Sequence, residues 1–362
     1  MPNFDVELIE EEWDDDFRPP RGKQYSVAAA DRIEQDPEGQ VVAVDRGRVM
    51  VLVDGEIVDA AYGGSMRRRK VAVGDRVRVR LPRSEGEASR LTDVLERTSV
   101  LERTSDDEVS QARLVAANVD QAVVVLAGDH LEAGTRFLDR VAVACEHGHV
   151  APVVCVNKLD VADADEVARV QSVYGDGAGY EVLLTSAVTG EGVDELRWRL
   201  EGCWTVLTGH SGVGKSSLVN LLVPDLDQAV AEVGRRGGRH TTVAARAEPV
   251  PGLSDAWVVD TPGVRSFGLG HLAENQLAGA FPELRDLNCD HHDCRHDGEP
   301  GCALDPAALP ASRLAAYRRL LSSVRGDDAW ERDEWGRASD DEADEARDAG
   351  GAEGGDGVGD DV

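Results

Sequence analysis

A glycine-rich segment at residues 209–217 has the residue types and spacing of a phosphate-binding loop. It contains the pattern G-x4-G-K-[ST] and lies between a predicted strand (Trp204–Thr208) and a predicted helix (Ser217–Leu222). Glycines let backbone N–H groups turn toward phosphate oxygens, Lys215 would neutralise the β and γ charges, and the Ser216 hydroxyl would bind Mg²⁺. We therefore predict that nucleotide phosphates are bound by Ser211, Gly212, Val213, Gly214, Lys215, Ser216 and Ser217.

Two further polar segments, each at the end of a predicted strand, have the pattern of a guanine site. Asn157-Lys158-Leu159-Asp160 follows the strand Pro152–Val156 and matches N-K-x-D, and Thr185-Ser186-Ala187 closes the next strand. A carboxylate at Asp160 can accept hydrogen bonds from N1–H and the exocyclic amine of guanine, whereas adenine would leave it unpaired. The predicted guanine site therefore contains Asn157, Lys158, Asp160, Ser186 and Ala187.

Segments expected to respond to a γ-phosphate follow the phosphate loop. Asp260-Thr-Pro-Gly263 matches D-x-P-G, so Asp260 would hold Mg²⁺ through water and the Gly263 N–H would reach the γ-phosphate. Residues 234–242, which include three glycines, form a loop that is costly to order and suits a switch clamped by γ-phosphate. Either Thr241 or Thr242 would be a second hydroxyl ligand of Mg²⁺, and we favour Thr242.

The order of these motifs along the chain is unusual. Ordinary GTP-binding domains begin with the phosphate loop and end with the base-reading motifs, whereas here residues 157–187 precede residues 209–263. The same sheet can be built from this order if the original chain ends are joined, so we predict a circular permutation. The second switch, residues 260–266, then leads directly into the C-terminal region and would act on it during hydrolysis.

A cluster of cysteines and histidines near the C-terminal end has the spacing of a metal site. Cys289-x4-Cys294-x-His296-x5-Cys302 supplies three thiols and one imidazole, the donor set of a closed, structural tetrahedral zinc site. His291 and His292 are alternative ligands. We predict one structural Zn²⁺, which would fold a segment too small for its own core, bound by Cys289, Cys294, His296 and Cys302.

The regions that must position these motifs differ in pattern. Residues 39–105 contain five short β-rich runs and predict a small barrel, with an OB-fold favoured over a similar SH3-like barrel. Residues 106–270 alternate apolar β-branched runs with helical stretches, as in an α/β domain with a parallel sheet. Residues 271–326 are expected to be helical around the metal site, and the acidic segments 1–38 and 327–362 to be disordered.

Composition excludes several classes of protein. The net charge is −30, of which −7 falls in residues 1–20 and −12 in residues 327–362. The sequence has no apolar run long enough to span a membrane, and its acidic start lacks the pattern of a signal peptide, so we expect a cytoplasmic protein without a membrane partner. The acidic balance opposes nonspecific binding to nucleic acid at low salt.

Taken together, the motifs resemble the RsgA/YjeQ family of circularly permuted GTPases that depend on the small ribosomal subunit. The resemblance spans residues 40–325 and rests on the barrel, the zinc spacing and segments 117–121, 157–160, 209–217, 238–242 and 260–265. It implies an OB-fold, a permuted GTPase domain and a zinc domain. It also implies binding to the small (30S) subunit late in maturation, with GTP hydrolysis stimulated by that particle.

The resemblance also implies catalytic roles. Val264 is apolar where many GTPases have a water-orienting glutamine, and the family substitute would be His240, unless this histidine contacts rRNA beside Arg239. We therefore expect hydrolysis of GTP to GDP and phosphate, with His240, Lys215 and Gly263 as catalytic residues.

Expected partners are the small subunit and its rRNA, with the protein acting as a monomer. Basic clusters suited to rRNA phosphate lie at residues 67–70 and 235–239. The alternative is a GTP-dependent RNA- or ribosome-binding switch whose hydrolysis is incidental. A tandem of the sequence LERTS, at residues 95–99 and 101–105, departs from the family pattern.

Overall fold

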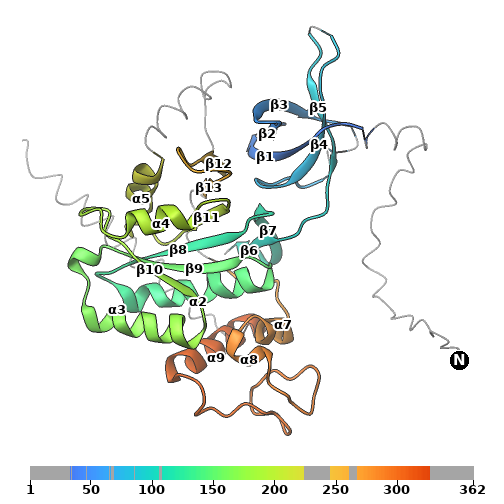
Figure 1. The fold of residues 1–362 in the computed structure, drawn as a ribbon. Helices are drawn as coiled ribbons and strands as arrows, with labels where there is room; N and C mark the ends of the chain where they lie inside the picture. The colour runs from blue at the N-terminus through green and yellow to red at the C-terminus, as the bar shows by residue number, and fades with distance from the viewer. Residues whose placement is uncertain are drawn as a thin grey trace, which may run out of the picture.

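The structure, a computed structural model, describes Ile33 and residues 35–223, 245–260 and 267–326, except positions 46, 65, 67, 68, 85, 106 and 107. Figure 1 shows a barrel of strands, a central sheet covered by helices, and further helices at the C-terminal end. The barrel and the central sheet form one continuous sheet of eleven strands, because they pair at Ala43 and Arg246.

Five strands close the N-terminal barrel in the order β1, β2, β3, β5, β4, with β4 pairing again with β1. Alternate residues face inward, as on β2, where Val49, Val51 and Val53 are buried and the residues between them are not. This closed five-stranded arrangement is that of an OB-fold and confirms the predicted barrel. The strands are β1 (Glu38–Asp45), β2 (Arg48–Val53), β3 (Glu56–Tyr62), β4 (Arg76–Arg80) and β5 (Ser89–Val94).

A two-stranded antiparallel hairpin connects the barrel to the central sheet. Its strands are β6 (Val100–Ser105) and β7 (Glu108–Ala117), and Val100 pairs with Ala117 at its base. The second LERTS copy lies in β6, and the domain boundary that we expected after residue 105 lies between β6 and β7.

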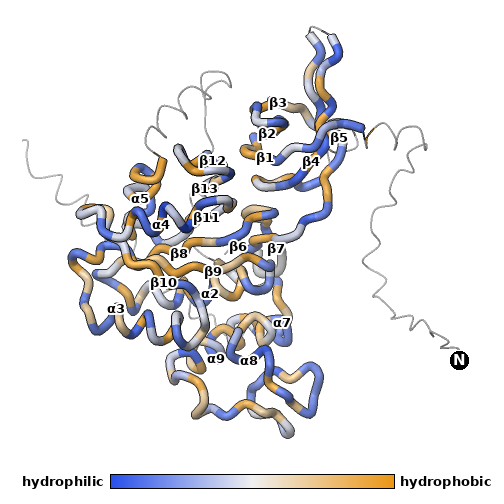
Figure 2. Tube along the Cα trace, in the orientation of Figure 1, coloured by the Kyte–Doolittle hydropathy of each residue, from blue (hydrophilic) through white to orange (hydrophobic). Residues whose placement is uncertain are grey.

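The central sheet has the order β10, β9, β8, β11, β13, β12, in which the first five strands are parallel and β12 is antiparallel. Every residue of β8 and β11 is buried, because helices cover both faces. Figure 2 shows the apolar character of β8 and β9. The strands are β8 (Gln121–Ala127), β9 (Ala151–Asn157), β10 (Glu181–Leu184), β11 (Trp204–Thr208), β12 (Arg246–Pro249) and β13 (Trp257–Asp260).

Helices cover the two faces of this sheet with separate cores. Val124 of β8 lies in the core that contains Leu138 of α2, whereas Val123 lies in the core that contains Leu196 of α4 and Leu218 of α5. The helical elements are α2 (Leu131–His147), the 3₁₀ turn Leu159–Val161, α3 (Ala164–Val170) with the π-helix Gln171–Gly177 that continues it, α4 (Val193–Arg199) and α5 (Lys215–Leu222).

The C-terminal region packs against α2, below the sheet in Figure 1. It contains α7 (Glu274–Gly279), α8 (Pro282–Arg285) and α9 (Ala311–Arg325), and Phe281 and Tyr317 meet edge to face in its core. Residues 286–310, all of them described, contain no helix or strand. Across the described chain, no helix is both long and apolar enough to cross a membrane.

Candidate nucleotide site and metal cluster

The predicted phosphate and guanine motifs lie at one edge of the central sheet. Parallel strands end at the same edge, and the motifs follow β9, β10, β11 and β13 directly. The chain proceeds outward from β8 to β9 and β10, and in the opposite direction from β11 to β13. Open α/β sheets bind ligands at such a reversal, which here lies beside the phosphate loop.

Gly214 makes the turn from the phosphate loop into α5. Its φ is +92°, in the left-handed region that side-chain-bearing residues rarely adopt. A Cβ at this position would lie 2.3 Å from Nδ2 of Asn157. The final glycine of the motif is therefore required both by backbone conformation and by the close approach of the loop that follows β9.

Lys215 lies folded over its own loop. Its ammonium donates to the carbonyl oxygens of Gly209 at 2.6 Å and His210 at 2.8 Å. Partial burial lowers the pKa of Lys215, and the negative charge of Asp260 opposes that shift. Ser211, Ser216 and Ser217 are exposed beside it, so the hydroxyl predicted to bind Mg²⁺ is accessible.

Asn157 connects three of the predicted loops through one buried side chain, which is 1% exposed. Its amide donates to the carbonyl oxygen of Val213 in the phosphate loop at 2.9 Å. Its Oδ1 accepts the backbone N–H of Ala187 at 3.0 Å. The side chain thus holds the base-reading and phosphate-binding segments in fixed positions relative to each other.

Lys158 and the end of β8 add a contact that the sequence motifs did not indicate. Lys158 has a left-handed backbone (φ +63°), and its ammonium forms an ion pair with Asp129 at 2.9 Å. The hydrogen bond from Lys158 lowers the pKa of Asp129. Asp129 follows β8 directly, at the same edge of the sheet as the predicted site, and that position is the only signal in the sequence that points to it.

Asp160 is exposed, and its carboxylate accepts a hydrogen bond from the hydroxyl of Ser186. Ser186 is fully buried, and its Oγ also accepts the backbone N–H of Thr189 at 3.2 Å. Two predicted guanine-site residues from different loops are therefore in direct contact, with one oriented by the other.

Several predicted residues lie outside the described part of the chain. Asp260 ends β13 and is described, but Gly263 and Val264 of the second switch are not, and neither are His240, Thr241 and Thr242 of the first. Their assignments stay predictions.

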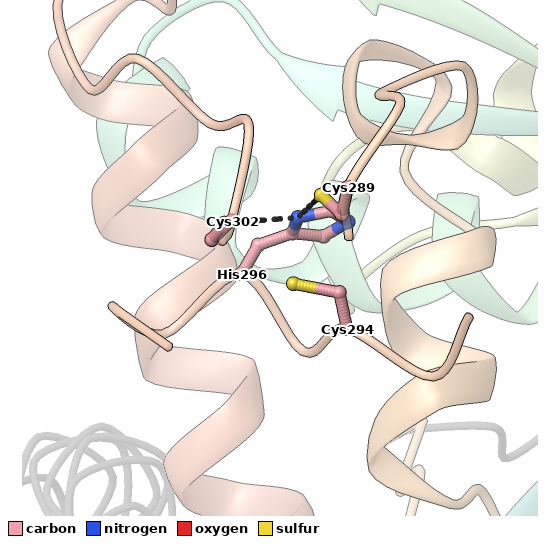
Figure 3. A group of neighbouring side chains, drawn as sticks. All are labelled: Cys289, Cys294, His296 and Cys302. Carbon is pink, nitrogen blue, oxygen red and sulfur yellow. Dashed lines mark hydrogen bonds between the residues drawn. The ribbon is translucent and has the colours of Figure 1, made fainter. Parts of the chain in front are cut away.

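Figure 3 shows the four predicted metal ligands gathered in one cluster in the C-terminal region. The ligand atoms of Cys289, Cys294, His296 and Cys302 all lie within 4.8 Å of one another, so they could hold a metal ion. The Nδ1 atom of His296 is 3.6 Å from Sγ of Cys289 and 3.5 Å from Sγ of Cys302.

The remaining histidines of this segment point elsewhere. His291 is exposed and its Nε2 contacts the carbonyl oxygen of Pro300 at 2.8 Å, and neither it nor the exposed His292 belongs to the cluster. Backbone N–H groups of Ala303 and Leu304 donate to two of the sulfurs, at 3.2 and 3.5 Å. Such contacts orient thiolate ligands around a metal.

Comparisons with known proteins agree with this geometry. Residues 94–270 match the family model of the RsgA GTPase. The protein named small ribosomal subunit biogenesis GTPase RsgA in Bacteroides fragilis is 36% identical over 284 residues, which cover 74% of this chain and 90% of the relative. The protein of the same name in Ectopseudomonas mendocina is 36% identical over 327 residues, covering 86% and 93%.

Solved structures show the same fold. YjeQ from Thermotoga maritima superposes with a TM-score of 0.65 at 28% identity, covering 80% of this chain and 99% of that one. YloQ, described as a circularly permuted GTPase, superposes with a TM-score of 0.60 at 26% identity, covering 82% and 97%. The permuted order of the motifs and the N-terminal barrel are thereby confirmed, and the chain belongs to the RsgA GTPase family.

Proposed function

We propose that this protein binds the small ribosomal subunit and couples GTP hydrolysis to a late step of its maturation and to its own release. The observation that carries the proposal is the contact of Asn157 with both Val213 and Ala187. A guanine-reading segment and a phosphate loop are thereby joined in a chain whose relatives are named for small-subunit biogenesis.

Guanine recognition is assigned to Asp160. The hydroxyl of Ser186 orients its carboxylate, which would then accept N1–H and the exocyclic amine of the base. The backbone N–H of Ala187, which donates to Oδ1 of Asn157, would contact the guanine oxygen. Under this proposal, the base and the phosphates would both be bound by the predicted GTPase domain, residues 106–270.

The phosphates and Mg²⁺ are assigned to the loop before α5. The ammonium of Lys215 would exchange its two carbonyl acceptors for phosphate oxygens, which carry more negative charge. Mg²⁺, which is bound together with the nucleotide, would be held by Ser216, Thr242 and, through water, Asp260.

Hydrolysis requires a group that orients water in line with the γ-phosphate. We assign this role to His240, because Val264 has no hydrogen-bonding group. The Gly263 N–H would contact the γ-phosphate at the same time. Closure of the first switch by the ribosomal partner would bring His240 into place, and phosphoryl transfer depends mainly on such positioning.

The C-terminal cluster is assigned to structural zinc. In a tetrahedral zinc site the metal is about 2.3 Å from sulfur and about 2.0–2.1 Å from nitrogen, which places those ligand atoms about 3.5–3.6 Å apart. The measured separations from Nδ1 of His296 to two sulfurs, 3.5 and 3.6 Å, match this value. The four protein ligands leave no open position for a reacting molecule, so the ion would stabilise the fold of residues 271–326.

Contact with rRNA is assigned to the barrel. Its strand β4 carries Arg76, Arg78 and Arg80 at alternate positions, with Lys70 exposed in the preceding loop. Several of these arginines form ion pairs with acidic neighbours such as Glu38, so RNA phosphate would have to compete with carboxylates. Binding should therefore depend strongly on salt.

The test is GTP turnover by the full chain, in the cytoplasmic range of salt, with and without purified ribosomal subunits. We expect small subunits to stimulate turnover and large subunits not to, and we expect the stimulation to fall as salt rises. Equal stimulation by large subunits would contradict the proposal. Nucleotide-dependent binding to small subunits without stimulated turnover would support the alternative, a switch whose hydrolysis is incidental.

A further inference from the structure

Directly after the second switch, residues 267–271, here called the exit segment, lie against the hairpin β6–β7. The backbone N–H of Thr104 donates to the carbonyl oxygen of Gly268 at 2.9 Å, and these two residues form an antiparallel bridge. The N–H of Gly270 donates to Oγ1 of Thr104 at 3.3 Å. A single threonine of β6 therefore fixes the backbone of the exit segment at two points.

This contact is close and is shielded from water. Thr104 is 4% exposed, and the adjacent Phe267 and Leu269 are 1% and 2% exposed. A Cβ placed on Gly268 would lie 2.2 Å from Oγ1 of Thr104 and 3.0 Å from its carbonyl oxygen. Only glycine allows the exit segment to approach β6 this closely.

A second anchor connects the exit segment to the phosphate loop. The ring of Phe137, on α2, meets the ring of Phe267 edge to face at 5.9 Å. The same ring lies 4.4 Å from the ring of His210 in the phosphate loop. A displacement of the exit segment would therefore shift its contacts with β6 and, through Phe137, with the phosphate loop.

At its other end the hairpin is bound to the barrel. The N–H of Ala117 donates to the carbonyl oxygen of Val73 at 2.9 Å, and the side chain of Asn118 donates to the carbonyl oxygen of Gly74 at 3.0 Å. Asn118 Oδ1 in turn accepts the N–H of Thr98 at 2.9 Å.

The first LERTS copy strengthens this junction. Arg97 donates to both carboxylate oxygens of Asp75, at 2.7 and 3.0 Å, and Asp75 is fully buried in the barrel. The two copies of the repeat thus have different neighbours: the first holds the barrel, and the second, through Thr104, holds the exit segment.

We propose that Thr104 is a positioning residue that passes the nucleotide state of the second switch through the hairpin β6–β7 to the barrel. The physical link is continuous: exit segment, Thr104, β6 and β7, Asn118, and the barrel turn Val73–Asp75. Because the nucleotide is read at one end and the barrel lies at the other, GTP and GDP would set two different positions of the RNA-binding part. This inference rests on the proposed GTPase switch.

The experiment compares hydrogen–deuterium exchange of the full chain bound to a non-hydrolysable GTP analogue and to GDP. In the unaltered protein we expect amides of residues 70–76 and 112–119 to exchange at rates that differ by about fivefold or more between the two states, the usual lower range of coupling between sites. In Gly268→Ala the difference should vanish, because the added Cβ forces the exit segment away from Thr104.

Two further variants isolate the contact. Gly279→Ala is the matched control, since a Cβ there meets nothing within 4 Å, and it should keep the difference. The double variant Gly268→Ala with Thr104→Ala should recover part of it, because the 2.2 Å clash with Oγ1 is removed. If Gly268→Ala does not fold, Thr104→Val decides, since it lacks the oxygen that accepts from Gly270 and should reduce the difference.

The inference would be overturned if Gly268→Ala or Thr104→Val kept the full difference in exchange rates between the GTP-analogue and GDP states. It would also be overturned if the unaltered protein bound and hydrolysed GTP but showed no such difference. Those results leave the proposed function intact. Failure to bind the GTP analogue at all would instead contradict the proposed function, and the inference would fall with it.

Discussion

At the scale of single residues, Asn157 has a different part from the one its motif suggests. Its amide is occupied by Val213 and Ala187, both on protein backbone. Its neighbour Asp160, to which we assign the reading of the base, is exposed and accepts a hydrogen bond from Ser186. In the proposed site, Asn157 would set the spacing between the base-reading and phosphate-binding segments, and Asp160 would supply the specificity.

Asp160→Asn is expected to lower the affinity for GTP by about 10- to 100-fold, which corresponds to the loss of roughly 1.5–3 kcal/mol from hydrogen bonds to a charged group. It should favour xanthosine triphosphate, whose 2-oxo group suits an amide donor. The Asn oxygen can still accept from Ser186, so the loop should keep its shape. Equilibrium binding of both nucleotides measures the change, with exposed Asp165→Asn as the control. Unaltered GTP affinity would remove Asp160 from the base site.

His240→Ala is expected to bind GTP and small subunits normally and to lose about 100-fold of the subunit-stimulated turnover, because an unpositioned water attacks less effectively. Single-turnover hydrolysis with saturating small subunits measures this. If turnover is retained and subunit affinity falls, His240 contacts rRNA instead and the catalytic assignment is wrong.

At the scale of elements, the turn from β11 into α5 depends on the packing of a neighbouring loop. Gly212 and Gly214 both have positive φ, at +80° and +92°. Only at Gly214 does a side chain also meet an obstacle, the buried amide of Asn157 at 2.3 Å. Backbone conformation therefore favours glycine at both positions, whereas a steric clash excludes a side chain only at Gly214.

Gly214→Ala is expected to lose nucleotide binding and to destabilise the protein by more than the roughly 1–2 kcal/mol that a left-handed residue costs. The matched control is Gly212→Ala, which has the backbone cost alone because nothing lies within 4 Å. Urea unfolding with and without GTP separates the two effects. Equal losses in both variants would show that the contact with Asn157 is unimportant.

Local pattern predicted the strands well and the long-range pairings poorly. Trp204–Thr208 is a strand with the predicted bounds, because such short apolar runs are typical of parallel sheets. The hairpin β6–β7 and strand β12 were not predicted. β6 contains charged residues and pairs with a segment more than 150 residues away at Gly268, and such contacts leave no local period.

The same limit applies to the site. The prediction of a site at Asp160, Ser186 and the phosphate loop, which lie at one sheet edge, rests on motif spacing. It could not show that Asn157 contacts backbone, or that Lys158 pairs with Asp129, since both depend on how neighbouring strands align. Among the three candidate histidines, only the fold places His296 with the cysteines.

At the scale of the whole molecule, a buried ionic cluster joins the C-terminal region to the GTPase core. Arg313 of α9 forms ion pairs with Asp139 of α2 at 2.7 Å and with Glu283 of α8 at 2.6 Å, and Arg313 and Asp139 are each 3% exposed. The guanidinium also lies over the rings of Phe281 and Tyr174. The region that follows the second switch is thus fixed to α2.

Arg313→Ala is expected to destabilise the protein by about 3–5 kcal/mol, because Glu283 loses its ion pair and buried Asp139 keeps only Arg319 and Tyr174. Urea unfolding monitored by tryptophan fluorescence measures this loss. Arg318→Ala, an exposed position on the same helix, should stay within about 0.5 kcal/mol of the unaltered protein. If Arg313→Ala also lowered the free energy of unfolding by no more than about 0.5 kcal/mol, the ionic cluster would contribute little to stability.

Removal of the metal should unfold part of the C-terminal region and leave the nucleotide site intact. We expect about one equivalent of zinc per chain. Cys294→Ala should unfold residues 286–310, which have no helix or strand to stabilise them, while GTP binding survives at the sheet edge. Elemental analysis and nucleotide binding are the measurements, with the buried Cys145→Ala as the cysteine control. Protein purified without chelator that contains no metal would refute the assignment.

The central position of β11 in the sheet also determines when the sheet can be completed during translation. β8, β9 and β10 are synthesised before β11, so β8, whose seven residues are all buried in the finished sheet, is an open edge until Trp204–Thr208 has emerged. Unpaired apolar edges template aggregation and recruit chaperones. The time needed to synthesise residues 128–203 therefore sets the interval in which the nascent chain is most prone to aggregation and most dependent on chaperones.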